Sequence, residues 1–122
     1  MVDHSHKPKY DLEERTLCFA RDVVAFVNSL PRTTSNIEIG RQLIRAAGSV
    51  GANYIEANEA LGKKDFLMRI KIARKESKEG RYWLYLVTCD EASRATQARL
   101  VQESTELMLI FSAILRKSMG RL

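Results

Sequence analysis

The stretch KKDFLMRIKIARKESKEGRYWLYLV, residues Lys63 to Val87, decides the fold because it repeats with a helical period and contains no proline. At about 100° per residue, its small and apolar side chains fall on one stripe, which predicts a face turned toward a core. The members of this stripe are Phe66, Ile70, Ala73, Ser77, Gly80, Leu84 and Val87. The sequence therefore predicts one long amphipathic helix over this stretch.

Two further surfaces share the same helix. A second apolar side gathers Met68, Ile72, Trp83 and Leu86. A helix of a monomer seldom needs such a side, so we expect it to be an oligomer interface. A third side is basic and consists of Lys64, Lys71, Lys75 and Lys78, with Arg74 and Arg81 toward the edge of the core stripe.

Charge is concentrated in this helix. The stretch has eight basic and three acidic residues, so its net charge equals the +5 of the whole chain, and the remaining residues balance to zero. Lysines spaced three and four residues apart lie about 5–6 Å from one another and can follow a phosphate backbone. The basic side therefore predicts a polyanion-binding surface.

Capping and stop signals also predict where the other helices begin and end. Asp11 and Glu14 have the spacing of a capping box, and Leu30 before a proline marks the end of the first helix. Ser35 and Glu38 repeat the capping-box spacing. We expect the second helix to run from there to about Leu61, with Gly62 as its terminator, and the third to end near Cys89.

The hydrophilic residues 90–97 are expected to form the longest connection of the fold, with Asp90 or Ser93 as the cap of the last helix. Four amphipathic helices with short connections predict an all-α fold, an antiparallel up-down-up-down four-helix bundle. In the second helix, Gly48 and Gly51 each cost roughly 1 kcal/mol relative to alanine, which suggests a closely approaching neighbour helix.

The length and composition of the chain indicate how many domains it has. The 122 residues are 45% hydrophobic, which fits a single domain over residues 11–120, preceded by a mobile arm over residues 1–10. No apolar run reaches the roughly 20 residues of a membrane span, and no signal-peptide pattern is present, so we expect a cytoplasmic protein without a membrane partner. In that compartment Cys18 and Cys89 are expected to be free thiols.

Candidates for catalysis are few. The histidines, His4 and His6, lie in the arm and have no further metal ligands nearby, and the helices contain no Glu-x-x-His pair for a di-metal site. Cys18 and Cys89 have no histidine partner in their helices. We therefore expect no catalytic residues, no metal and no cofactor.

The sequence also resembles a known family. The segments that carry the resemblance are FARDVVAFVNSLP (Phe19 to Pro31), QLIRAAGSVGANYIEA (Gln42 to Ala57) and KKDFLMRIKIARKESKEGRYWL (Lys63 to Leu84). Together they resemble the four-helix-bundle proteins encoded in intervening sequences of bacterial 23S ribosomal RNA, and the resemblance covers about residues 11–117.

The resemblance implies a subunit that assembles into a ring-shaped homopentamer, with no catalytic activity or cofactor. It also implies a distant relationship to the accessory protein of diversity-generating retroelements, a basic pentamer that binds nucleic acid and a reverse transcriptase. On these grounds we expect a non-enzymatic oligomer that binds RNA or DNA through its basic side. The alternative is a structural or adaptor oligomer that binds a protein partner and has no role with nucleic acid.

Aromatic residues bear on both expectations. Tyr82, Trp83 and Tyr85 are interleaved with Lys78 and Arg81, as in surfaces that bind single-stranded nucleic acid. Trp83 shares its side with the apolar residues, and tryptophan is favoured in protein interfaces. For Trp83 we therefore favour the structural role.

Overall fold

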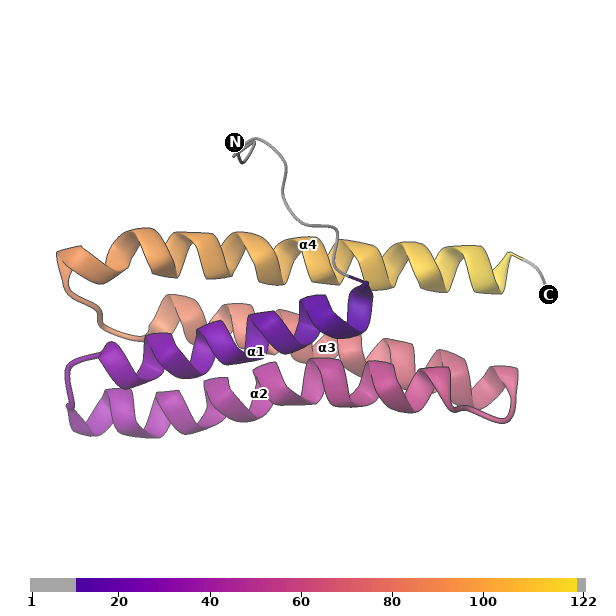
Figure 1. Cartoon of the computed structure of the whole chain (residues 1–122), viewed down its shortest axis with the longest axis horizontal. Coiled ribbons are helices and arrows are strands. Elements are labelled where there is room, and N and C mark those ends of the chain that lie inside the picture. Colours follow the sequence, from indigo (N-terminus) through magenta and orange to yellow (C-terminus); the bar gives the residue numbers. More distant parts are fainter. Residues whose placement is uncertain (1–10, 121–122) are drawn as a thin grey trace, which may run out of the picture.

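Four long helices make up the computed structural model, which describes residues 11–120. They are α1 (Leu12–Ser29), α2 (Thr34–Asn58), α3 (Lys63–Leu86) and α4 (Arg94–Met119), with a 3-10 turn, η1 (Glu91–Ser93), before the last. The helices lie side by side and alternate in direction, with the α1–α2 and α3–α4 connections at one end and the α2–α3 turn at the other (Figure 1). The predicted four-helix bundle is confirmed. The predicted arm, with His4 and His6, lies outside the described residues.

The core runs the length of the bundle and takes side chains from every helix. Its largest fully buried apolar members are Phe19, Val23, Leu43, Val50, Ile70, Leu84, Leu100, Leu107 and Phe111. The helices α2 and α3 pack most extensively on each other, whereas the shorter α1 packs mainly on α2 and less on α4. Among residues 11–120, no helix combines the length and the apolar character that crossing a membrane would require.

The first helix begins and ends where the sequence indicates. The Asp11 side chain accepts a hydrogen bond from the Glu14 backbone N–H at 2.8 Å, which satisfies one of the free donors at the helix start. Leu30 has extended backbone angles, because the following Pro31 disfavours the helical conformation, and its buried side chain closes that end of the core.

The predicted ends of the second helix were wrong. Its cap is Thr33, whose Oγ1 accepts from the Asn36 N–H at 3.1 Å, and Ser35 already lies inside the first turn. The helix ends at Asn58, so Leu61 is fully exposed in the α2–α3 turn instead of being the last residue of the helix. Gly62 does not terminate α2. With φ of −147° and ψ of 163° it is the extended residue that precedes α3.

The connection between α3 and α4 begins earlier than predicted. The third helix ends at Leu86 instead of near Cys89, and α4 begins at Arg94, directly after Ser93, which is one of the two predicted caps. Asp90 is a cap, as one of the two predicted candidates, but it caps the 3-10 turn by accepting from the Ser93 N–H at 3.0 Å. Ser93 makes no side-chain capping bond to α4.

A buried asparagine joins the two connections at that end of the bundle. The Nδ2 of Asn36 donates to the carbonyl oxygens of Pro31 at 2.9 Å and Thr88 at 2.8 Å, and its Oδ1 accepts from the Thr88 N–H at 3.0 Å. A buried amide is stable only if its hydrogen bonds are satisfied, and here both of its polar atoms have partners. Asn36 thus ties the α1–α2 connection to the segment that follows α3.

The two central glycines of α2 differ in their surroundings. A Cβ built on Gly51 would lie 2.8 Å from the Oγ1 and 3.2 Å from the Cβ of Thr16, a buried residue of α1. A Cβ built on Gly48 would meet nothing within 4 Å. The predicted close approach is therefore confirmed for Gly51, whereas nothing in the described subunit approaches Gly48.

This difference predicts opposite effects on stability. Gly48→Ala should raise the free energy of unfolding by about 0.5–1 kcal/mol, because alanine restricts the unfolded chain and favours the helix. Gly51→Ala should lower it by about 1–3 kcal/mol, because the crowded Thr16 is held by the bond from its Oγ1 to the Glu13 carbonyl at 2.9 Å. Urea unfolding of both variants measures the difference, and equal stabilisation by both would contradict the packing argument.

Candidate nucleic-acid interface

A row of lysines runs along the outer face of α3. Lys64, Lys71, Lys75 and Lys78 are all exposed, and no ion pair of these side chains is found among residues 11–120. From Lys64 to Lys78 the row is about 21 Å long at 1.5 Å per residue. It can therefore lie beside about six phosphates of one strand, which in a duplex are about 3.4 Å apart along the axis.

Two arginines border this row on the side of α4. Arg74 and Arg81 are half-buried, and the Nη1 of Arg81 donates to the Thr105 Oγ1 of α4 at 3.2 Å. The structure thus brings together the six predicted basic residues along one helix, but it divides them into four free lysines and two arginines set against the bundle. Arg81 serves the packing of α3 on α4 as well as the surface charge.

The acidic residues of α3 lie on its other side, toward α2. Glu76 forms an ion pair with Arg45 of α2 at 3.0 Å, and Glu79 approaches the same guanidinium at 3.6 Å. Asp65 approaches Arg69 at 4.0 Å. Because Glu76 and Glu79 are engaged with α2, away from the lysine row, they leave its charge largely uncompensated. Lys75 alone of the four is close enough to Glu79 to help lower the pKa of that carboxyl.

Glu76 was not singled out from the sequence, yet it is only 6% exposed in the seam between α2 and α3. Burial by itself would raise its pKa, but hydrogen bonds with Glu79, Ser49 and Arg45 and the positive charge of Arg45 lower the pKa on balance. The pKa of Glu79 is raised, chiefly by its hydrogen bond to Glu76 and then by burial. The two pKa shifts are opposite in sign, so Glu76 loses its proton before Glu79 as the pH rises.

This pair predicts a pH dependence of stability. The proton on Glu79 stabilises the fold fully below the ordinary glutamate pKa of 4.5, and this contribution is lost as the pH rises through the higher folded pKa. The ionised Glu76 contributes in the opposite sense, because its folded pKa is lowered and its contribution disappears as the pH falls below that value. In Glu79→Gln the side-chain amide can donate to Glu76 at every pH. The loss of stability above the ordinary glutamate pKa should therefore vanish in this variant.

Urea unfolding of wild type and Glu79→Gln between about pH 3 and 8 measures this effect. Glu56→Gln, which removes one exposed carboxyl of α2, controls for the change in net charge. Parallel curves for wild type and Glu79→Gln above the ordinary glutamate pKa would show that the proton on Glu79 does not stabilise the fold.

The predicted second apolar side of α3 is divided between surface and core. Met68 and Leu86 are 46% and 48% exposed, whereas Ile72 and Trp83 are partly buried. Trp83 packs against the core cluster of its own bundle, so part of its surface is covered without a second subunit, and its place in an oligomer interface stays a prediction. Its Nε1 is buried and has no hydrogen-bond partner within residues 11–120.

A shallow groove joins the apolar side to the lysine row. It has a volume of about 790 Å³ and is lined by Gly62, Lys64, Asp65, Leu67, Met68, Lys71, Ile72 and Lys75. The sequence separated an apolar side from a basic side, but along the first half of α3 the two surfaces meet, with apolar side chains between lysines. Leu67 was missed because on a helical wheel it lies across the lysine row from Met68 and Ile72, next to Arg74.

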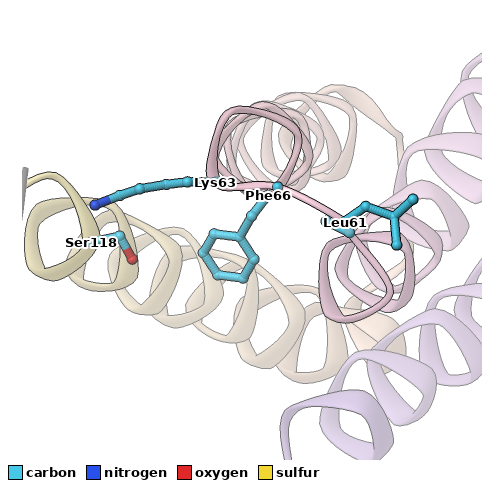
Figure 2. Close-up of a pocket in the computed structure, with 6 residues that line it drawn as sticks. Leu61, Lys63, Phe66 and Ser118 are labelled. Carbon is cyan, nitrogen blue, oxygen red and sulfur yellow. The ribbon is translucent and has the colours of Figure 1, made fainter.

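A second depression lies at the α2–α3 turn and carries no recognisable chemistry. In Figure 2 the ring of Phe66 points toward α4, the Lys63 side chain extends toward Ser118, and Leu61 points away. Its volume is about 400 Å³, and Ala60 and Gly62 complete its lining. In the described part of the chain, no three potential metal ligands gather. Cys18 and Cys89 are half-buried, and the Cys89 thiol donates to the Gln97 Oε1 at 3.3 Å.

Comparisons with known proteins agree on one family. The family model described as 23S rRNA-intervening sequence protein matches residues 9–113. A crystal structure from Bacteroides thetaiotaomicron, described as a protein with unknown function from the S23 ribosomal protein family, is similar to the chain with a TM-score of 0.74 and 28% identity. That similarity covers 86% of this chain and 98% of the other. No curated protein matches the chain in sequence.

Proposed function

Because the chain belongs to the 23S rRNA-intervening sequence protein family, we propose that it is a non-enzymatic homo-oligomer that binds nucleic acid through the basic side of α3. The observation that carries this proposal is the exposed lysine row, whose charge is largely uncompensated because Glu76 and Glu79 pair with Arg45 of α2 and Asp65 approaches Arg69. The residues assigned to binding are Lys64, Lys71, Arg74, Lys75, Lys78 and Arg81. The protein is proposed to act in the cytoplasm.

Oligomerisation belongs to the same proposal. Met68 and Leu86 leave nearly half of each apolar side chain in water, which favours a second subunit as their cover. The number five comes from the family resemblance described above, and a closed ring is consistent with the common symmetries of homo-oligomers. Assembly would repeat one lysine row around the ring and so multiply the field that attracts a polyanion.

Binding of nucleic acid is tested by titrating labelled single- and double-stranded RNA and DNA with the wild-type protein at several salt concentrations. Affinity should fall steeply between about 50 and 200 mM salt, because each neutralised phosphate releases counterions. It should change little with base sequence, since phosphate contacts carry no sequence information. Nucleic acid that co-purifies with the protein and is removed by high salt would also support the proposal. It is detected by the ratio of absorbance at 260 and 280 nm.

One observation favours an adaptor function as the second candidate. The groove between the lysines has an apolar floor of Leu67, Met68 and Ile72, which suits an acidic amphipathic helix of a protein partner. The same titration separates the two candidates. If no nucleic acid binds at about 50 mM salt, the nucleic-acid proposal fails and the adaptor function takes its place.

A further inference from the structure

Two exposed tyrosines continue the lysine row toward the end of α3. Tyr82 and Tyr85 are 61% and 66% exposed. Tyr82 follows Lys78 by four residues and Lys75 by seven, so it lies on the same outer face. Tyr85 follows Tyr82 by three residues, one helical turn further along. The outer face of α3 is therefore cationic over its first two thirds and aromatic over its last third.

Tyr85 lies toward the side of α4, and Tyr82 lies in line with the lysine row, between Tyr85 and the apolar side. Tyr85 follows Arg81 by four residues, and Arg81 marks the side of α4 by its bond to Thr105. Leu86 follows Glu79 by seven residues, and Glu79 marks the side of α2 by its approach to Arg45. A second subunit that covers Met68 and Leu86 from the α2 side can therefore leave the tyrosines in water.

A protein partner is a poor cover for these rings. To bury Tyr82 it would also have to exclude water from Lys75 and Lys78, and a buried lysine is costly unless it gains a carboxylate partner. A nucleic acid satisfies both needs, because phosphates neutralise the lysines at a wet surface while bases cover the rings. Tyr82 is also held in position, since its ring packs edge-on against Trp83 at a centroid distance of 5.1 Å and an angle of 76°.

We infer that the ligand of this face is a single-stranded nucleic acid, with phosphates along Lys71, Lys75 and Lys78 and bases stacked on Tyr82 and Tyr85. This inference rests on the proposed function of the basic side. A duplex keeps its base faces stacked inside the helix and can offer the tyrosines only its edges and backbone, whereas a single strand exposes a π-face at every base. Lysines along the backbone with aromatic rings under the bases are the combination that sequence-independent single-strand binding uses.

The test compares oligo(dT) and oligo(U) of about 20 nucleotides with a duplex of equal length, using fluorescence anisotropy on the full-length oligomer. Stacking one base on an aromatic ring contributes roughly a five- to hundredfold gain in affinity. The wild type should therefore prefer the single strand by about tenfold or more. Tyr82→Leu with Tyr85→Leu should remove that preference while leaving duplex affinity and the salt slope unchanged, because leucine keeps apolar bulk and removes only the π-face.

Three controls test whether the aromatic rings of the tyrosines cause the preference for a single strand. Tyr82→Phe with Tyr85→Phe retains the π-face and should bind within about twofold of the wild type. Ile55→Ala changes an exposed apolar residue of α2 and should have no effect. Poly-L-glutamate, an acidic polymer without bases, should compete at least about tenfold more weakly than oligo(U) at equal charge.

Photocrosslinking supplies a measurement that needs no variant. A single strand with 5-iodouracil should crosslink to the wild type at Tyr82 or Tyr85. Equal affinity for single strand and duplex, unchanged binding by the double leucine variant, or crosslinks elsewhere only would each overturn the inference while leaving the basic-side proposal standing. Failure of every nucleic acid to bind would overturn both.

Discussion

Lys71→Glu with Lys75→Glu is expected to abolish binding of nucleic acid near physiological salt. Both side chains lie in the middle of the row and are exposed, so the exchange reverses the field of that surface without disturbing the core. Each lost phosphate contact should flatten the slope of log affinity against log salt by roughly one unit, or about two in total. Affinity should fall by about a hundredfold or more at ~100 mM salt. The measurement is the anisotropy titration, repeated at four or more salt concentrations.

The matched control changes net charge equally on other helices. Arg21→Glu with Arg41→Glu alters an exposed arginine of α1 and an exposed arginine of α2 that lies beside α1. It should weaken binding far less, because surface charges more than about a Debye length from the bound strand are largely screened. Equal losses in the two double variants would show that binding depends on total charge and that α3 is not the site.

Met68→Glu with Leu86→Glu is expected to convert the oligomer into a monomer of 13.9 kDa. Covering a large apolar side chain contributes about 1.5–3 kcal/mol to the free energy of association. A carboxylate in its place would have to be desolvated without a partner. Because each subunit of the proposed ring would contribute this surface to a contact, the loss of binding energy would recur at every interface. Light scattering after size-exclusion chromatography measures the mass, and circular dichroism should show an unchanged helix content.

Ile55→Glu with Leu109→Glu is the corresponding control, since these side chains are 47% and 59% exposed on α2 and α4. It adds the same two carboxylates away from the proposed interface and should leave the mass unchanged. If this control dissociates and the α3 variant does not, the interface lies on another face. Trp83→Ala is unsuitable here, because Trp83 also packs against the core and its loss would destabilise the subunit.

The helical stripes could be predicted because they depend only on local spacing. Ile70, Ala73, Ser77, Gly80 and Leu84 are buried as the 3.6-residue period requires. The ends of α2 could not be predicted as reliably, because several hydroxyl residues compete for the cap. Thr33 prevails over Ser35 because a helix begun at Thr34 brings Asn36 to both connections. That choice depends on Thr88, which is 52 residues away in the sequence.

The division of α3 into charged surfaces was only partly predictable. The wheel placed the lysines on one side correctly, because exposure follows from distance to the core stripe. It could not show that Glu76 and Glu79 would meet Arg45, since that contact depends on how α2 and α3 are rotated about their axes. The uncompensated row is thus a tertiary property, although the residues that form it are adjacent in the sequence.

The hydrogen bonds of Asn36 have a consequence for engineering the chain. They require fixed spacing between Pro31 and Thr88, so an insertion in either of the two connections at that end would leave a buried amide without partners. The opposite turn, residues 59–62, has the fully exposed Leu61 at its tip and no comparable tie from a buried side chain among the described residues. An epitope tag or a peptide tether is therefore best grafted there, beside Leu61, where it extends the bundle lengthwise.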